Sequence, residues 1–184
     1  MSAVLTTQLA YDAYLAWEAS QIGRHEFFQG QVFAMLGPQR VHGEIVRNLT
    51  VALQTHLKGS PCRSYSADMK LRVAAADAVF YPDLFVTCDT RDLVSELVFE
   101  HPTLIVEVLS DSTAAYDRGL KFAAYRQLPS LVEYVLIAPE RRSVEVFRRN
   151  PEHLFVLHDF TGSALVEFKS VGASVATSIV FENV

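Results

Sequence analysis

An unbroken apolar run with one carboxylate at its centre constrains this chain more than any other feature. The run is Thr103-Leu-Ile-Val-Glu-Val-Leu-Ser110, and its only acid is Glu107. Apolar residues on both faces are typical of a central strand that is covered on both sides. Because an isolated buried carboxylate is strongly disfavoured, Glu107 must meet a cation or a metal ion. The run therefore predicts a layered fold of helices and strands with a polar site inside it.

A second acid interrupts an apolar segment in the same way. Asp83 follows Pro82 within the segment 78–88. Proline in a strand is confined to starts, edges and bulges, so we expect a kink that turns the Asp83 side chain. Two carboxylates on neighbouring strands can share one divalent cation, and oxygen ligands suit Mg²⁺ or Mn²⁺. The alternative is that Asp83 and Glu107 each pair with an arginine for structural reasons.

A helix is predicted after Ser112 and extends to about Leu128. Asp117, Lys121 and Tyr125 are four residues apart and share one face of this helix. A lysine on a helix that follows the Glu107 strand can reach back over that carboxylate and stabilise charge on a phosphate. The alternative is an ordinary Asp-Lys surface pair, which contributes little.

The remaining pattern predicts one domain over residues 1–184, of the α/β (α+β) class with a mixed sheet flanked by helices. Thr6 or Thr7 is a candidate cap for a first helix, and Gly37-Pro38 ends a hairpin around Gln29-Gly30. Helices are expected at 6–21, 41–57 and 112–128. Strands are expected on both sides of the hairpin turn within 25–36 and at 62–73, 78–88, 103–110, 133–138, 143–149, 153–160, 163–169 and 178–183.

Composition excludes several classes of protein. No apolar run is long enough to span a membrane, and the N-terminal segment lacks the basic start and apolar block of a signal peptide, so we expect a cytoplasmic protein. Cys62 and Cys88 belong to no Cys/His cluster, which argues against a zinc site. We expect both to be free, buried thiols.

The net charge of -5 argues mildly against a nucleic-acid binder, but the charge is unevenly distributed. Acidic residues dominate 89–117, whereas basic residues dominate 118–149. This second segment is either a local basic face that binds phosphate or a solvated surface of ion pairs. Its basic residues are Arg118, Lys121, Arg126, Arg141, Arg142, Arg148 and Arg149.

Four motifs in a fixed order resemble the PD-(D/E)XK nuclease superfamily. They are Tyr-Pro-Asp83, Ile-Val-Glu107-Val-Leu-Ser, Tyr-Asp117-Arg-Gly-Leu-Lys121-Phe-Ala-Ala-Tyr125-Arg and Ser-Leu-Val-Glu133-Tyr-Val-Leu-Ile. The chain is more closely similar to the bacterial Uma-two family of restriction-endonuclease-like proteins, and the likeness covers nearly its whole length. The resemblance implies a restriction-endonuclease-like core around a metal site, with extra antiparallel strands at the C-terminus.

In that resemblance Asp83 is the motif aspartate and Glu107 the motif acid, and both hold the metal together with the Val108 carbonyl. Glu26 completes the metal shell, although it also fits an ordinary exposed strand residue. The superfamily pattern places lysine two residues after the acid, where this chain has Leu109, so Lys121 is expected to substitute for it.

Other candidates carry weaker expectations. His42 lines the pocket or merely begins a helix, and Asp68 orients Lys121 or lies near the metal. Asp117 and Tyr125 belong to the pocket or serve only in capping and packing. Arg118 and Arg126 are candidate phosphate contacts.

The implied activity is Mg²⁺-dependent endonucleolytic hydrolysis of DNA, with Mn²⁺ as a substitute and RNA as an alternative substrate. The rival interpretation is a nuclease-fold module that binds nucleic acid or a protein partner without efficient cleavage. We also expect a homodimer, because the C-terminal strands are more apolar than a small monomer needs. The apolar residues concerned are Phe155, Val156, Leu157, Phe160, Leu165, Val166 and Phe168.

Overall fold

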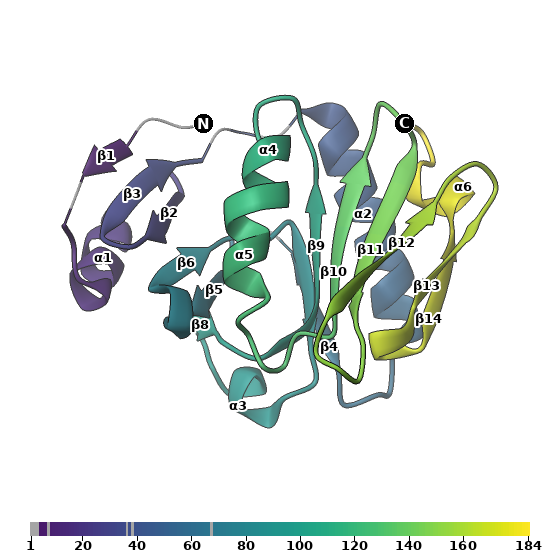
Figure 1. Cartoon of the computed structure of the whole chain (residues 1–184). Helices are drawn as coiled ribbons and strands as arrows, with labels where there is room; N and C mark the ends of the chain where they lie inside the picture. Colours follow the sequence, from purple (N-terminus) through teal and green to yellow (C-terminus); the bar gives the residue numbers. More distant parts are fainter. Residues whose placement is uncertain (1–3, 7, 36, 38, 67) are drawn as a thin grey trace.

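A central six-stranded sheet organises the fold (Figure 1). The computed structural model describes residues 4–6, 8–35, 37, 39–66 and 68–184. The strand order is β12-β11-β10-β9-β7-β4, with bounds β4 Arg63–Ser66, β7 Leu84–Thr87, β9 Pro102–Val108, β10 Glu133–Ala138, β11 Ser143–Arg149 and β12 Phe155–Phe160. β9 and β10 are parallel, and the other neighbouring pairs are antiparallel. The predicted mixed sheet is therefore confirmed.

A second sheet lies on the N-terminal side in the order β1-β3-β2-β6-β5-β8. Its strands are β1 Val4–Thr6, β2 His25–Phe28, β3 Gln31–Ala34, β5 Lys70–Val73, β6 Ala78–Phe80 and β8 Val98–Phe99. The segments 62–73 and 78–88, each predicted as one strand, are divided between the two sheets. The first division lies at Asp68, which has a φ of 56°, and the second at Tyr81-Pro82-Asp83. The predicted kink at Pro82 is thus confirmed and is sharper than expected.

Helices cover both faces of the central sheet. Helix α2 (Arg40–His56) packs Ile45, Leu49 and Leu53 on one face, as the predicted helix 41–57 requires. The other face is covered by α4 (Ala114–Tyr116), a π-helical turn η2 (Asp117–Lys121) and α5 (Phe122–Tyr125), which together form the helix predicted at 112–128. Within the described residues, no helix is long and apolar enough to cross a membrane.

The N-terminal helix is shorter than predicted. Helix α1 covers Tyr11–Glu18, and Thr6 belongs to β1, which pairs with β3. Thr6 is therefore no cap, and Thr7 lies outside the described residues. The hairpin β2–β3 is confirmed, with Gln29 at φ 48° and Gly30 at φ 82° in its two-residue turn. Pro38, the predicted stop, also lies outside the described residues.

The C-terminal segment adds a small hairpin of β13 (Leu165–Phe168) and β14 (Ala173–Ala176). The strand predicted at 178–183 is wrong, because α6 (Thr177–Val180) occupies most of that segment. Val180 and Phe181 are both buried against the core on the α2 side, and such a short apolar run is ambiguous between helix and strand. The other elements not predicted are the strands β1, β8 and β14, the helix α3 (Thr90–Leu93) and the 3₁₀ turns η1 (Ala74–Ala76) and η3 (Lys169–Val171).

The expectation of free thiols is also wrong, because Cys62 and Cys88 form a disulfide. Strand β4 pairs with β7 in a register that matches Arg63 with Thr87. One step further along, this register sets Cys62 opposite Cys88. Two cysteines 26 residues apart meet only once that pairing is known, so their spacing alone gave no indication of a bond.

Candidate metal and phosphate site

Asp83, which follows the kink at Pro82, lies at the end of β9 beside Val108. Continuing the β7–β9 register, which pairs Leu84 with Val106, places Pro82 opposite Val108. Pro82 has no N–H for the Val108 carbonyl, and the Val108 N–H instead donates to Asp83 Oδ2 at 2.7 Å. The Asp83 carboxylate thus accepts the Val108 N–H in place of a main-chain carbonyl, and Pro82 offers the Val108 carbonyl no donor.

Glu107 lies on the same face of the sheet and is almost completely buried. Its Oε1 accepts hydrogen bonds from Lys121 Nζ at 3.1 Å and from the Tyr125 hydroxyl at 3.0 Å. The Asp83 N–H lies 3.5 Å from Glu107 Oε2. The two motif acids are therefore adjacent, and neither is paired with an arginine among the described residues, contrary to the structural alternative.

Lys121 is the cation at the centre of the cluster. Its Nζ lies 2.9 Å from Glu26 Oε1, 3.1 Å from Glu107 Oε1 and 3.5 Å from Asp117 Oδ1. The π-helical turn η2 carries both Asp117 and Lys121, and such turns, which are rare, frequently occur at functional sites. Glu26 arrives from β2, and the Tyr81 N–H lies 3.4 Å from its Oε1. The alternative of an exposed strand glutamate does not hold, because Glu26 is buried.

The cluster contains more acidic than basic side chains. Burial raises the pKa of Glu107 well above its ordinary value; Lys121 opposes this, while Asp83, Asp117 and Glu26 add to it. Burial likewise raises the pKa values of Glu26 and Asp117 against the opposing charge of Lys121. Burial lowers the pKa of Lys121, but Glu107 and Glu26 outweigh this and raise it well above its ordinary value. The lysine is therefore charged and is outnumbered by carboxylates.

His42 in the first turn of α2 adds a polar contact to Asp83. Its Nε2 lies 3.0 Å from Asp83 Oδ1. Burial lowers the pKa of His42, but the hydrogen bond and charge of Asp83 outweigh this and raise it. The structure thus places His42 beside Asp83, at the edge of the acidic cluster.

The oxygen donors fit a hard divalent cation. The Glu107 carboxylate lies beside the Asp83 main chain, the Asp83 carboxylate lies beside the Val108 main chain, and a divalent cation would favour the ionised form of both acids. In the part of the chain that the structure describes, no three His, Cys, Asp or Glu side chains already form a coordination shell. Lys121 lies between Glu26, Glu107 and Asp117, so a full shell would require carboxylate oxygens to turn toward the ion.

Three predicted residues do not join the cluster. Asp68 is exposed and pairs with Arg24 at 3.0 Å, so the expectation that it orients Lys121 is wrong, and its side chain lies outside the acidic cluster. Arg118 makes a two-pronged ion pair with Glu145. Arg126 is exposed beyond the end of α5.

The basic segment 118–149 is mostly engaged within the chain, as its ion-pair interpretation predicts. Arg148 pairs with the buried Glu133, Arg141 approaches Glu145, and the guanidinium groups of Arg142 and Arg149 donate to main-chain carbonyls. These contacts leave little of the segment as a free basic face.

A second buried polar group beside the cluster was not predicted. Glu18 accepts hydrogen bonds from the His25 N–H at 3.0 Å and the Tyr81 hydroxyl at 2.7 Å, and its Oε2 lies 2.9 Å from His25 Nδ1. His25 precedes Glu26, and Tyr81 donates its N–H to Glu26, so Glu18 fixes both neighbours of that acid. The available signal was the four-residue spacing of Tyr14 and Glu18, which places both on the buried face of α1.

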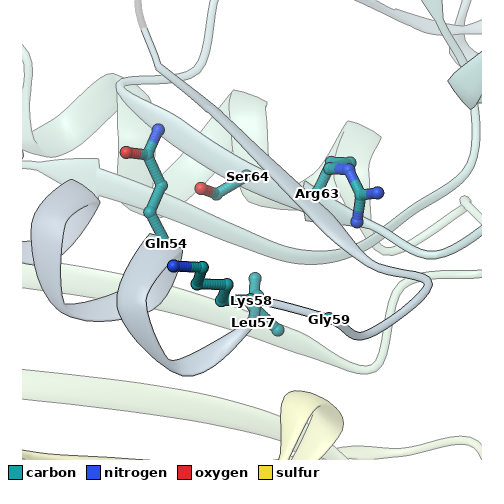
Figure 2. Close-up of a pocket in the computed structure, with 6 residues that line it drawn as sticks. All are labelled: Gln54, Leu57, Lys58, Gly59, Arg63 and Ser64. Atoms are coloured by element: carbon teal, nitrogen blue, oxygen red, sulfur yellow. The ribbon is translucent and has the colours of Figure 1, made fainter.

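A shallow surface pocket of about 350 Å³ lies at the opposite end of α2 (Figure 2). Its lining residues are Gln54, Leu57, Lys58, Gly59, Arg63 and Ser64. The Arg63 guanidinium donates to the carbonyls of Ser60 and Cys62, and the C-terminal end of a helix repels anions. The pocket therefore does not suit a phosphate, whereas His42 at the other end of α2 contacts the acidic cluster.

The fold belongs to the restriction-endonuclease-like class. It has a mixed sheet with helices on both faces, and its two neighbouring acids lie on β9 and just before β7. A solved structure described as a putative nuclease belonging to DUF820, from Anabaena variabilis, has this fold, with a TM-score of 0.79. The two are 18% identical, and the match covers 94% of this chain and 97% of that one.

The chain belongs to the Uma2 family, described as "Putative restriction endonuclease", whose match covers residues 11–174. Two uncharacterized proteins from Synechocystis sp. are similar to it. One, slr1290, is 35% identical over 174 residues, covering 95% of this chain and 92% of the relative. The other, sll1609, is 31% identical over 172 residues, covering 91% of this chain and 97% of the relative. The resemblance stated from the sequence motifs is confirmed.

Proposed function

We propose that the protein is a metal-dependent endonuclease that hydrolyses phosphodiester bonds in DNA. One observation carries the proposal: at the end of β9 the Glu107 carboxylate lies 3.5 Å from the Asp83 main-chain nitrogen and 3.1 Å from Lys121 Nζ. Membership of a family described as restriction endonucleases supports a nucleic-acid substrate. Mg²⁺ suits the all-oxygen donor set, and Mn²⁺ can substitute for it.

Each residue has a definable role in this proposal. Asp83, Glu107 and the Val108 carbonyl would hold the ion, and Glu26 would complete its shell. Bound there, the ion supplies Lewis-acid polarisation of the phosphate and lowers the pKa of a water molecule. Lys121 stabilises charge that develops on the phosphate, a role that needs the positive charge its carboxylate neighbours maintain.

The phosphate backbone needs further contacts outside the cluster. Arg126 is exposed and available for this, whereas Arg118 would first have to leave Glu145. Contacts of this kind position a nucleic acid without reading its sequence. They therefore suit either DNA or RNA, and DNA is proposed on the family description alone.

Cleavage of supercoiled plasmid in Mg²⁺ or Mn²⁺ tests the proposal. Wild-type protein should nick the plasmid, Asp83→Asn should lose at least a hundredfold in rate, and the exposed Asp12→Asn on α1 should match wild type. Equal nicking by wild type and Asp83→Asn would refute the site. Chelation with EDTA should abolish the wild-type reaction.

The second candidate is a nuclease-fold module that binds nucleic acid or a protein partner without efficient cleavage. It is favoured by Leu109 at the superfamily's lysine position and by three carboxylates that already surround Lys121. On this alternative, labelled DNA should bind in fluorescence anisotropy with no metal-dependent product. Nicking that is lost in Glu107→Gln would exclude it.

A further inference from the structure

Strand β12 is the last strand of the central sheet, and the β13–β14 hairpin that follows it lies beside it as a separate sheet (Figure 1). Asn150 N–H donates to the Leu154 carbonyl, and Arg149 N–H to the Val132 carbonyl on the far side of β11. With the β11–β12 register, these bonds direct the main-chain groups of even-numbered β12 residues toward β11. The N–H and C=O groups of Phe155, Leu157 and Asp159 therefore point away from the sheet.

The side chains of this edge are apolar on both faces. Val156 is 44% exposed and Leu157 is 49% exposed, and successive strand residues point to opposite faces. The usual defences of an edge strand are charged side chains, above all lysine, together with proline and bulges, and the only carboxylate on this edge is Asp159. Residues 155–160 contain neither lysine nor proline, and their register with β11 is unbroken. Such an edge can accept another strand.

The charges of Asp159 and Arg149 indicate which strand could pair with this edge and in which register. Asp159 is exposed and has no cation within ion-pair distance among the described residues. The Arg149 guanidinium lies 4.8 Å from the centre of the Phe155 ring, and its hydrogen bonds go to main-chain carbonyls. A strand that places a carboxylate beside Phe155 would give Arg149 an acidic neighbour. The edge itself carries such a carboxylate four residues from Phe155, at Asp159.

We propose that β12 pairs antiparallel with β12 of a second copy about a twofold axis at Leu157. In this register Leu157 faces Leu157 of the second copy, and Phe155 faces its Asp159 beside Arg149. All the outward main-chain groups of residues 155–159 are then paired. A register centred on Asp159 would set two like charges opposite each other, which is unfavourable. The partner is therefore a second copy of this chain, and the contact is a closed twofold interface.

The pairing places both candidate sites on one side of a continuous sheet. Residues directly opposite in an antiparallel pair project from the same face, so the α4–α5 sides of the two copies coincide. Val166 and Phe168, which were expected at the dimer interface from the sequence, are buried in the core of their own chain, so that part of the prediction is wrong. The interface proposed here does not depend on the nuclease assignment.

Light scattering coupled to size-exclusion chromatography tests the pairing. Wild-type protein at tens of micromolar should have twice the 20.5 kDa mass of one chain. Leu157→Lys, which sets two ammonium groups at the axis, should halve that mass. Leu97→Lys, the same change at another exposed leucine, should remain dimeric. A monomeric wild type or a dimeric Leu157→Lys would overturn the proposal.

A cysteine at the axis gives a positive test that does not depend on destabilising the edge. Opposed Cα atoms in a hydrogen-bonded antiparallel pair are about 5.5 Å apart, within the range of a disulfide. Oxidised Leu157→Cys should migrate as a covalent dimer on a non-reducing gel, and Leu97→Cys should not. The native cysteines are bonded to each other and do not compete. Equal cross-linking of the two variants, or of neither, would contradict the register.

Discussion

At the scale of single residues, Lys121 decides whether the acidic cluster is stable. Its ammonium group contacts Glu26, Glu107 and Asp117 in a site from which solvent is excluded. A buried charge deprived of its partner costs much more than a surface charge. The lysine therefore has a structural role in the metal-free protein in addition to the proposed role on phosphate.

Lys121→Met should destabilise the protein by about 3 kcal/mol at pH 8, because it leaves three buried carboxylates without their cation. Burial already raises the pKa of Glu26, and the lysine opposes that rise. In the Lys121→Met variant, which lacks the ammonium group, the pKa of Glu26 should therefore rise further. A raised folded-state pKa gives stability that is present at acid pH and lost as pH rises, so the penalty should shrink toward pH 5.

Urea denaturation at pH 5 and pH 8 measures this difference. Lys58→Met, a change at an exposed lysine, should be near neutral at both values. A penalty for Lys121→Met that does not depend on pH would contradict this account of the cluster.

The sequence alone placed Asp83, Glu107 and Lys121 together, because each is a charged residue within an apolar strand or helix face. The spacing of Tyr14 and Glu18 indicated that Glu18 lies on the buried face of α1, but its partners could not be predicted, because His25 and Tyr81 are 7 and 63 residues away. The prediction for Asp68 was wrong because of the local backbone conformation. Its left-handed backbone turns the chain between two sheets and leaves its side chain at the surface.

At the scale of elements, helix α1 holds Glu26 in position through Glu18. The Glu18 carboxylate accepts bonds from the main chain of β2 and from Tyr81 at the end of β6. The pairing of β2 with β6 fixes the same region from the sheet side. Glu26 is thus positioned by three elements that meet only in the folded chain.

Glu18→Ala should destabilise the protein by about 2–3 kcal/mol, because it leaves buried donors of His25 and Tyr81 without an acceptor. It should also weaken metal binding, since Glu26 loses its fixed neighbours. Thermal denaturation and calorimetric titration with Mn²⁺ measure the two effects. Asp12→Ala on the exposed face of α1 is the matched control, and equal behaviour of the two variants would reject this role for Glu18.

Element boundaries were predictable where periodicity was long and failed where the chain changed sheets. Helix α2 followed from the apolar repeat that includes Ile45, Leu49 and Leu53. The segment 62–73 read as one strand because its alternation continues on both sides of Asp68, but local pattern does not say which sheet a strand joins. That choice depends on long-range pairing, such as β4 with β7.

At the scale of the whole molecule, the Cys62–Cys88 bond links β4 to β7 at the end of β7 opposite to Asp83. Strand β7 is thus held by β9 near the site and by a covalent bond at its other end. Replacing both cysteines with serine should lower the free energy of unfolding by about 3 kcal/mol, the value typical of a loop of this size.

Thermal denaturation with and without reductant checks this prediction. Reductant should lower the midpoint of the wild type and leave that of the double variant unchanged. A wild-type midpoint that is insensitive to reductant, together with two titratable thiols in the unreduced protein, would contradict the bond.

Calorimetric titration of Mn²⁺ tests the central claim most directly. Wild-type protein should bind the ion, Asp83→Asn and Glu107→Gln should each lose binding by tenfold or more, and the exposed Asp12→Asn should bind as wild type does. Circular dichroism checks that all four proteins are folded. Binding that survives in both site variants, or its absence from folded wild-type protein, would contradict a metal site formed by Asp83 and Glu107.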